Sequence, residues 1–151
     1  MRILLIGLIY LFFSCSPKKS QQLENNDGEL SQNDPRVKRA FVLAQDSLLF
    51  FIETFNKSQG QVAYNFFIKT KLDNSNGFER VWARPFSVLN NTFNCTLDSN
   101  PKSLTGYKFG DTIQVNFDTV EDFMIILGDS VIGNYLQREL NKDLKKSPIQ
   151  H

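Results

Sequence analysis

Two aspartates suggest the first chemistry in this sequence, because a pair of carboxylates can divide acid and base work between them. Asp98 stands in the segment Leu-Asp-Ser-Asn-Pro, and Asp111 directly follows Gly110. Both positions are turn-like, and an Asp side chain in a turn commonly accepts hydrogen bonds from nearby backbone amides. We therefore expect Asp98 and Asp111 to shape turns, and we keep a hydrolase that uses carboxylates as the alternative.

A lysine and the sole tryptophan form a second candidate site. Lys69 and Trp82 are predicted to lie on neighbouring strands, where an ammonium group over the indole ring can bind an anion or help to hold a sugar. The more common arrangement is a tryptophan in the core with the aliphatic part of the lysine packed along it. The sequence leaves both interpretations open, so Lys69 and Trp82 are candidate ligand or interaction residues.

Histidine and cysteine are too scarce for the usual catalytic and metal sites. The only histidine is His151, the last residue, and Cys95 shares one expected strand face with Phe93 and Leu97, which indicates a buried, inert thiol. The chain has 17 basic and 16 acidic residues, without the basic excess of a nucleic-acid binder. We expect no enzyme activity, no cofactor, no metal and no nucleic acid. The expected function is that of a non-catalytic binding or protein-interaction domain.

Cys15 has a different chemical role, because it follows an export signal. Arg2 precedes an apolar run at residues 3–13, which is shorter than the roughly 20 residues needed to span a bilayer. Residues 1–14 match a removable signal peptide. Residues 12–15, Phe-Phe-Ser-Cys, then resemble the lipobox of bacterial lipoproteins, in a bulky form similar to that of Bacteroidota. The resemblance implies cleavage before Cys15 and lipidation of its thiol; the alternative is an ordinary signal or uncleaved anchor with a coincidental cysteine.

Residues 15–33 are predicted to comprise the lipidated cysteine and a flexible tether, because their polar composition buries too little apolar surface to fold. The residues directly after Cys15 lack an acidic cluster like the surface-export signal of Bacteroidota lipoproteins. We therefore expect a lipid anchor in the outer membrane and a domain that faces the periplasm, with a protein partner in the cell envelope. The alternative function, a hydrolase that uses carboxylates, would then act in the cell envelope.

Residues 34–146 predict one α+β domain, followed by a disordered tail at 147–151. Asp34 and Pro35 mark the start of a helix, whose apolar residues recur at steps of three and four as far as Phe55. Alternating stretches separated by turns then predict strands at residues 62–70, 80–89, 93–97, 112–117 and 123–127. Three leucines from Leu136 onward mark a C-terminal helix. We expect an N-terminal helix packed on a curved antiparallel sheet of about five strands, with a short C-terminal helix.

The order of motifs along this domain is also informative. After the first helix come an aromatic strand at residues 64–69, a strand with Trp82, a Leu-Asp-x-Asn-Pro segment at 97–101 and a Gly-Asp pair at 110–111. In this order the motifs resemble the YegJ-like family of bacterial domains of unknown function (DUF family twenty-three fourteen). The resemblance covers nearly the whole domain and implies a shared fold, but the family has no established activity to transfer.

The closing motif of that family is Ile-x-Asp-Trp, a hairpin, Gly-Gly-Tyr and an Arg three residues later. Asp122, Gly133 and Arg138 match it, whereas Phe123 replaces the Trp and Asn134 replaces the second Gly. Asp122 and Arg138 flank the last hairpin, where they can form a charged clamp for a ligand or a structural salt bridge or cap. We take both as further candidate ligand residues.

Ser130 is a candidate modification site. It stands in the tripeptide Asp-Ser-Val at the tip of the last expected hairpin, and this tripeptide resembles the acceptor for O-glycans in Bacteroidota. A hydroxyl at a hairpin tip is accessible to a transferase. We therefore expect Ser130 to be the position at which an O-glycan is attached.

Overall fold

Helices α1 (Pro35–Asp46) and α2 (Leu48–Lys57) open the fold in the computed structural model, which describes residues 30–58, 61–75 and 77–146. Asp34 caps α1 by accepting a hydrogen bond from the Arg36 amide, and Pro35 lies in the first turn. The single helix that the sequence predicts is divided at Ser47. The buried residues of the two helices still form one stripe: Val37, Ala40, Ala44, Leu48, Phe51 and Phe55.

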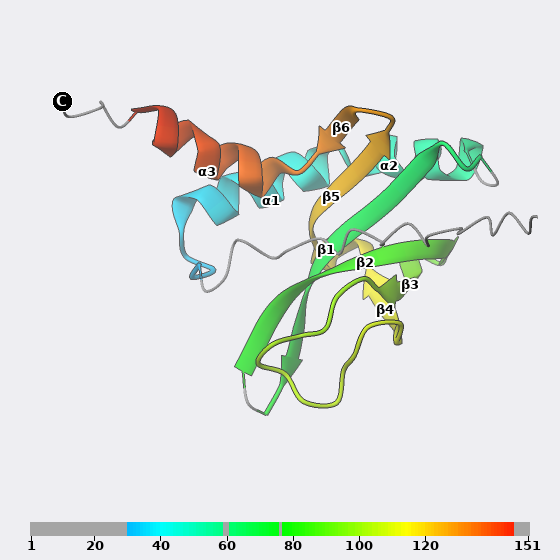
Figure 1. The fold of residues 1–151 in the computed structure, drawn as a ribbon, viewed down its shortest axis with the longest axis horizontal. Coiled ribbons are helices and arrows are strands. Elements are labelled where there is room, and N and C mark those ends of the chain that lie inside the picture. The colour runs from blue at the N-terminus through cyan, green and yellow to red at the C-terminus, as the bar shows by residue number, and fades with distance from the viewer. Residues whose placement is uncertain (1–29, 59–60, 76, 147–151) are drawn as a thin grey trace, which may run out of the picture.

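The sheet has six antiparallel strands in the order β4-β3-β2-β1-β5-β6 (Figure 1). In chain order they are β1 (Tyr64–Asn74), β2 (Gly77–Leu89), β3 (Thr92–Leu97), β4 (Thr112–Asn116), β5 (Val120–Leu127) and β6 (Ser130–Gly133). A 3₁₀ turn, η1 (Phe117–Thr119), joins β4 to β5. The predicted α+β fold is confirmed. The sequence indicates about five strands and misses β6, because four residues are too few to establish an alternating pattern.

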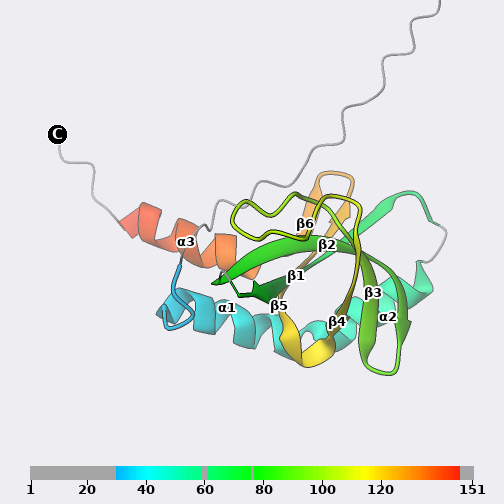
Figure 2. The same ribbon diagram turned by 90° about the horizontal axis from the view of Figure 1, so that it is seen from below.

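The two faces of the sheet are covered by different parts of the chain. Helices α1 and α2 lie along one face, and the long loop from Asp98 to Asp111 lies on the opposite side (Figure 2). The main core is between the sheet and the helices, where the Phe51 ring contacts Phe66, Phe93 and Phe123. A smaller apolar cluster on the other face consists of Phe67, Trp82 and Met124. Phe67 interrupts the alternating sequence pattern because β1 is buried on both faces.

Helix α3 (Tyr135–Lys146) packs beside α1 (Figure 1). Val37, Ala40 and Leu136 form the apolar part of this contact. Arg39 adds a polar contact, since its Nε donates to Glu139 Oε2 at 2.8 Å. Among the described residues, no helix is both long and apolar enough to cross a membrane.

Several predictions for single side chains can be compared with their surroundings. Trp82 is buried, which agrees with the interpretation of this residue as part of the core. Phe123 is also buried, in a different cluster on the opposite face of the sheet. Cys95 is fully buried, and this burial raises the pKa of its thiol to about 12, which confirms the buried thiol. Phe41 and Val62 fit the sequence pattern of buried residues, yet both are exposed.

Candidate binding site

Lys69 and Trp82 lie directly opposite each other on β1 and β2. The Lys69 Nζ atom is 4.5 Å from the centroid of the Trp82 ring. Both side chains are almost entirely buried, so the pair combines a cation–π contact with a tryptophan that packs in an apolar cluster. The sequence predicted these two strands to be neighbours, and the structure brings the two residues together.

A second cation–aromatic pair lies beside the first and is not among the candidates predicted from the sequence. The Arg84 guanidinium carbon is 4.4 Å from the Phe67 ring centroid. Arg84 is two residues beyond Trp82 on β2, and Phe67 is two residues before Lys69 on β1. Since side chains two apart in a strand share a face, all four lie on the face opposite the helices. This spacing was the available signal, but the break in pattern at Phe67 obscured it.

Asp98 connects this pair to the long loop. Its Oδ1 accepts a hydrogen bond from Arg84 Nε at 2.5 Å, and its backbone amide donates to the Trp82 carbonyl oxygen at 3.0 Å. The second oxygen, Oδ2, and the neighbouring Ser99 hydroxyl are buried, and neither has a hydrogen-bond partner among the described residues. An unpaired buried polar group costs about 1–3 kcal/mol of folding free energy. This cost exceeds the stabilisation of up to about 1 kcal/mol that a surface ion pair usually provides.

The other polar residues of the loop hold its shape. Asp111 Oδ2 accepts a hydrogen bond from the Lys108 amide at 2.9 Å, and Asn100 Oδ1 accepts one from the Phe109 amide at 2.7 Å. These are the local contacts expected for aspartate and asparagine in turns. Asp98 and Asp111 are thus used differently: Asp98 orients an arginine, whereas Asp111 closes a turn.

Asp122 holds the start of α3. Its Oδ1 accepts from the amides of Phe123 and Tyr135 at 2.8 and 3.0 Å, and its Oδ2 accepts from the Leu136 amide at 2.9 Å. Burial raises the pKa of this carboxyl above its usual value, against the opposing effect of the three amides and of Lys69. The geometry is that of a helix cap rather than of a ligand clamp.

Arg138 also contacts the last hairpin. Its Nη2 donates to the Val131 carbonyl oxygen at 2.9 Å, and its guanidinium lies 5.9 Å from the Tyr135 ring centroid. Arg138 forms no hydrogen bond or ion pair with Asp122 within the described part of the chain. The structure therefore does not combine these two candidates into one charged site.

The turn between β6 and α3 explains the departure at Asn134. Gly133 and Asn134 both have positive φ angles, of 82° and 55°, and Asn adopts this left-handed conformation more readily than most residues. No residue other than glycine fits at position 133, because an added Cβ would lie 2.2 Å from the Phe123 carbonyl oxygen. The same oxygen accepts the Asn134 amide at 2.7 Å. Asp122, Gly133 and Asn134 thus form one structural unit that starts α3.

The sequence comparison agrees with this arrangement of motifs. The model of a family described as an uncharacterized protein conserved in bacteria (DUF2314) matches residues 34–150. The chain belongs to the DUF2314 family. The family expected from the motifs is therefore confirmed. No match was found among curated proteins or among solved structures.

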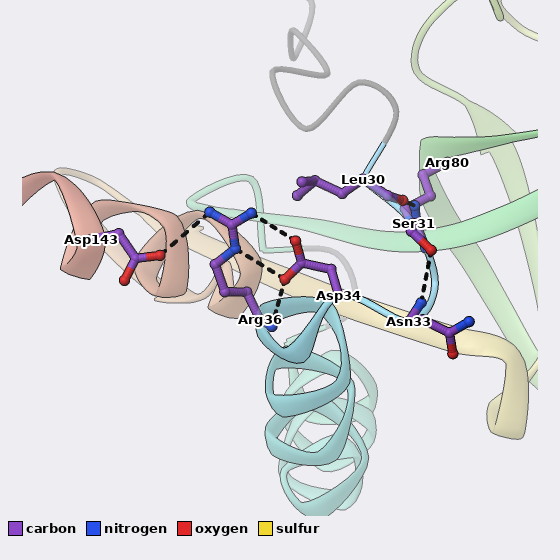
Figure 3. Close-up of polar contacts among 7 residues, drawn as sticks. All are labelled: Leu30, Ser31, Asn33, Asp34, Arg36, Arg80 and Asp143. Carbon is purple, nitrogen blue, oxygen red and sulfur yellow. Dashed lines mark hydrogen bonds and ion pairs between the residues drawn. The ribbon is translucent and has the colours of Figure 1, made fainter.

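Residues just before the start of the family match also contact the DUF2314 domain. The Leu30 carbonyl oxygen accepts a hydrogen bond from Arg80 Nη1 at 2.8 Å (Figure 3). Beyond it, Arg36 bridges Asp34 at 2.7 Å and Asp143 of α3 at 3.4 Å (Figure 3). The last residues of the predicted tether therefore contact the domain. Cys15 and the rest of residues 1–29 lie outside the described residues, as does the tail at 147–151.

Two further observations concern the surface of the DUF2314 domain. Ser130 is exposed at the start of β6, directly after the turn at Gly128 and Asp129. Among the described residues, no group of three or more His, Cys, Asp or Glu side chains is arranged to hold a metal ion.

Proposed function

We propose that this protein is an exported lipoprotein, anchored to a membrane by lipid on Cys15, and that its DUF2314 domain is a non-catalytic module that binds a protein partner. The observation that carries this proposal is the pair of cation–aromatic contacts on one sheet face, Lys69 over Trp82 and Arg84 over Phe67. We define these four residues as the ligand face. Arg84 is the member that a partner can reach, since its side chain is 41% exposed, whereas Phe67, Lys69 and Trp82 are buried and hold that face in place. Aromatic and arginine side chains held in fixed positions are typical of the residues that dominate protein interfaces.

The contacts of the carboxylates favour binding over hydrolysis. Asp98 is bonded to Arg84, Asp111 to the Lys108 amide, and Asp122 to three amides around the start of α3. A general acid or base must be able to reach the proton that it transfers. Carboxylates committed to an arginine or to backbone amides support an envelope hydrolase less well than a binding module. Asp122 and Arg138 are likewise engaged in holding α3, so the proposed ligand face does not include them.

The anchor is proposed from the sequence. The bacterial modification supplies at least two acyl chains, and two chains hold a protein stably on a membrane, whereas one holds it only marginally. A tether from Cys15 to about residue 30 allows the domain to stand off the lipid headgroups. We propose the outer membrane as the location and the periplasm as the compartment that the domain faces. Ser130, which is exposed, is the proposed position of an O-glycan.

The two halves of the proposal are tested separately. Cell fractionation of a Cys15→Ala variant should show release from the membrane or accumulation of an unprocessed precursor, because no acyl chain can be attached. Normal processing and membrane retention of that variant would refute the anchor.

Affinity capture of the wild-type protein from detergent-solubilised envelopes should recover a partner in a fixed ratio. A Trp82→Phe variant, which keeps an aromatic ring in the cluster, should retain it, whereas an Arg84→Lys variant should lose it.

A further inference from the structure

Arg84 is held as a recognition group. Its Nε is fixed by Asp98 and its flat face rests on Phe67, but neither terminal nitrogen forms a hydrogen bond with another described residue. Its side chain is 41% exposed, whereas that of Asp98 is only 5% exposed. A guanidinium fixed through Nε presents its two terminal nitrogens as parallel donors, which match the two oxygens of a carboxylate.

The unpaired atoms beside Arg84 specify a second part of the ligand. Asp98 Oδ2 requires a hydrogen-bond donor, and the Ser99 hydroxyl can either donate or accept. A ligand that satisfies Asp98 carries a hydrogen-bond donor close to its carboxylate, and the N–H group of a peptide is such a donor. Both atoms are buried, so Ser99 and the residues that follow it must shift to admit the donor, while Asp98 keeps its bonds to Arg84 and to the Trp82 carbonyl oxygen. This stretch lies outside the strands, and the unmet hydrogen bonds favour such a change.

We propose that Arg84, Asp98 and Ser99 form a subsite for a carboxylate with a neighbouring N–H group, as found at the C-terminus of a peptide chain. Arg84 binds the carboxylate, and Asp98 and Ser99 bind the amide N–H. This inference rests on the proposed binding function and names the part of the partner that is recognised. A free α-amino acid offers the same chemistry, with an ammonium group in place of the amide.

The charge of the subsite opposes a phosphate ligand. Arg84 and Asp98 together carry no net charge, so a dianion would gain one attraction and meet one nearby repulsion. A monovalent carboxylate meets a smaller repulsion from Asp98, and a neighbouring N–H group offsets that repulsion by donating a hydrogen bond to the same aspartate. The subsite therefore distinguishes a peptide terminus from an inorganic anion.

Titration calorimetry on the purified full-length protein tests the subsite, with fluorescence of Trp82, the only tryptophan, as a second readout. The probes are N-acetyl-dialanine with a free C-terminus, its C-terminal amide, free alanine and inorganic phosphate. We expect saturable binding of the free acid, binding of the amide that is at least roughly tenfold weaker, which corresponds to about 1.4 kcal/mol, and no binding of phosphate. The amide has lost the charge that Arg84 recognises.

Variants assign the effect to these residues. Arg84→Lys should weaken binding of the free acid at least roughly tenfold, because lysine cannot form the two parallel bonds. Ser99→Ala should weaken it several-fold and removes only a hydroxyl, so it provides the test if Arg84→Lys does not fold. Arg138→Lys is the matched control, since Arg138 also lies over an aromatic ring but forms no ion pair with a carboxylate in the described part of the chain, and this variant should bind like the wild type.

The outcomes separate the subsite from the proposed function. Equal binding of the acid and the amide, or equal losses in Arg84→Lys and Arg138→Lys, would overturn the subsite. Absence of binding by any probe, together with recovery of a partner from envelopes, would overturn the subsite and leave the binding function intact. Binding of alanine alone would support the subsite and overturn the protein partner.

Discussion

The Asp122 carboxylate accepts a hydrogen bond from the Leu136 backbone amide at 2.9 Å and thereby joins strand β5 to the first turn of α3. The two residues are 14 apart in sequence, and the β5–β6 hairpin lies between them. The two carboxyl oxygens at this position accept hydrogen bonds from amides that the helix leaves unpaired. The hairpin and α3 should therefore be stabilised as one unit.

An Asp122→Asn substitution should lower the free energy of unfolding by about 1–2 kcal/mol at neutral pH, the usual cost of a lost helix cap. Asparagine keeps one acceptor oxygen, but its NH₂ group would face one of the backbone amides that donate a hydrogen bond to Asp122 in the wild type. Urea denaturation followed by circular dichroism measures the change. Asp129→Asn is the control, because Asp129 is exposed in the β5–β6 turn. The unfolding free energy of this variant should match that of the wild type.

The same variant should reveal how Asp122 titrates. Its pKa is raised above the ordinary value of 3.8 in the folded protein, so the folded state holds the proton more tightly than the unfolded state. The stabilisation by Asp122 is therefore fully present below about pH 3.8 and declines as the pH rises through the folded-state pKa. The difference in unfolding free energy between wild type and Asp122→Asn should narrow from pH 3 to pH 7. A difference that widens over this range would mean that the three amides outweigh the effect of burial.

Gly133 should be the least replaceable glycine among those described. Alanine there would place Cβ 2.2 Å from the Phe123 carbonyl oxygen, at a φ of 82°. We expect Gly133→Ala to cost more than about 3 kcal/mol, since a steric clash in a buried turn adds to the 1–2 kcal/mol of left-handed strain. Gly128→Ala has a positive φ but open space around Cβ and should cost only the strain. Equal losses in the two variants, measured by thermal unfolding, would show that the close approach at Gly133 is unimportant.

Cys95 should be unreactive until the domain unfolds. Its thiol is fully buried, and a pKa of about 12 leaves almost no thiolate at neutral pH. Alkylation with N-ethylmaleimide at pH 7.5 should therefore be very slow under native conditions and rapid in concentrated urea. Fast alkylation of Cys95 in the native protein, located by peptide mass mapping, would contradict the burial.

Much of the fold could be predicted because its signals are local. The cap at Asp34, the apolar stripe as far as Phe55 and the alternation around Cys95 each lie within one element, where neighbouring residues determine the outcome. The break at Ser47 and the short strand β6 could not be predicted, because they depend on packing against α3 and on pairing with β5.

The candidate site was only partly predictable for the same reason. The expected order of strands pairs Lys69 with Trp82, and the local sequence predicts a turn at Asp98. That Asp98 bonds to Arg84, fourteen residues earlier, depends on how the 98–111 loop lies against β2, which no local pattern records. Phe67 departs from the alternating pattern of β1 because this strand is buried on both faces, and the departure obscures the spacing that relates Phe67 to Lys69.

The most direct test of the ligand face is photo-crosslinking in living cells. A photoreactive benzoylphenylalanine replaces Phe109, which is 47% exposed in the 98–111 loop, or Leu49, which is 66% exposed on α2 at the opposite side of the sheet. The account predicts a defined crosslinked species from position 109, no such species from position 49, and loss of the position-109 species when Arg84→Lys is added. Crosslinking from position 49 alone, or a position-109 species that Arg84→Lys leaves unchanged, would contradict a partner bound at this face.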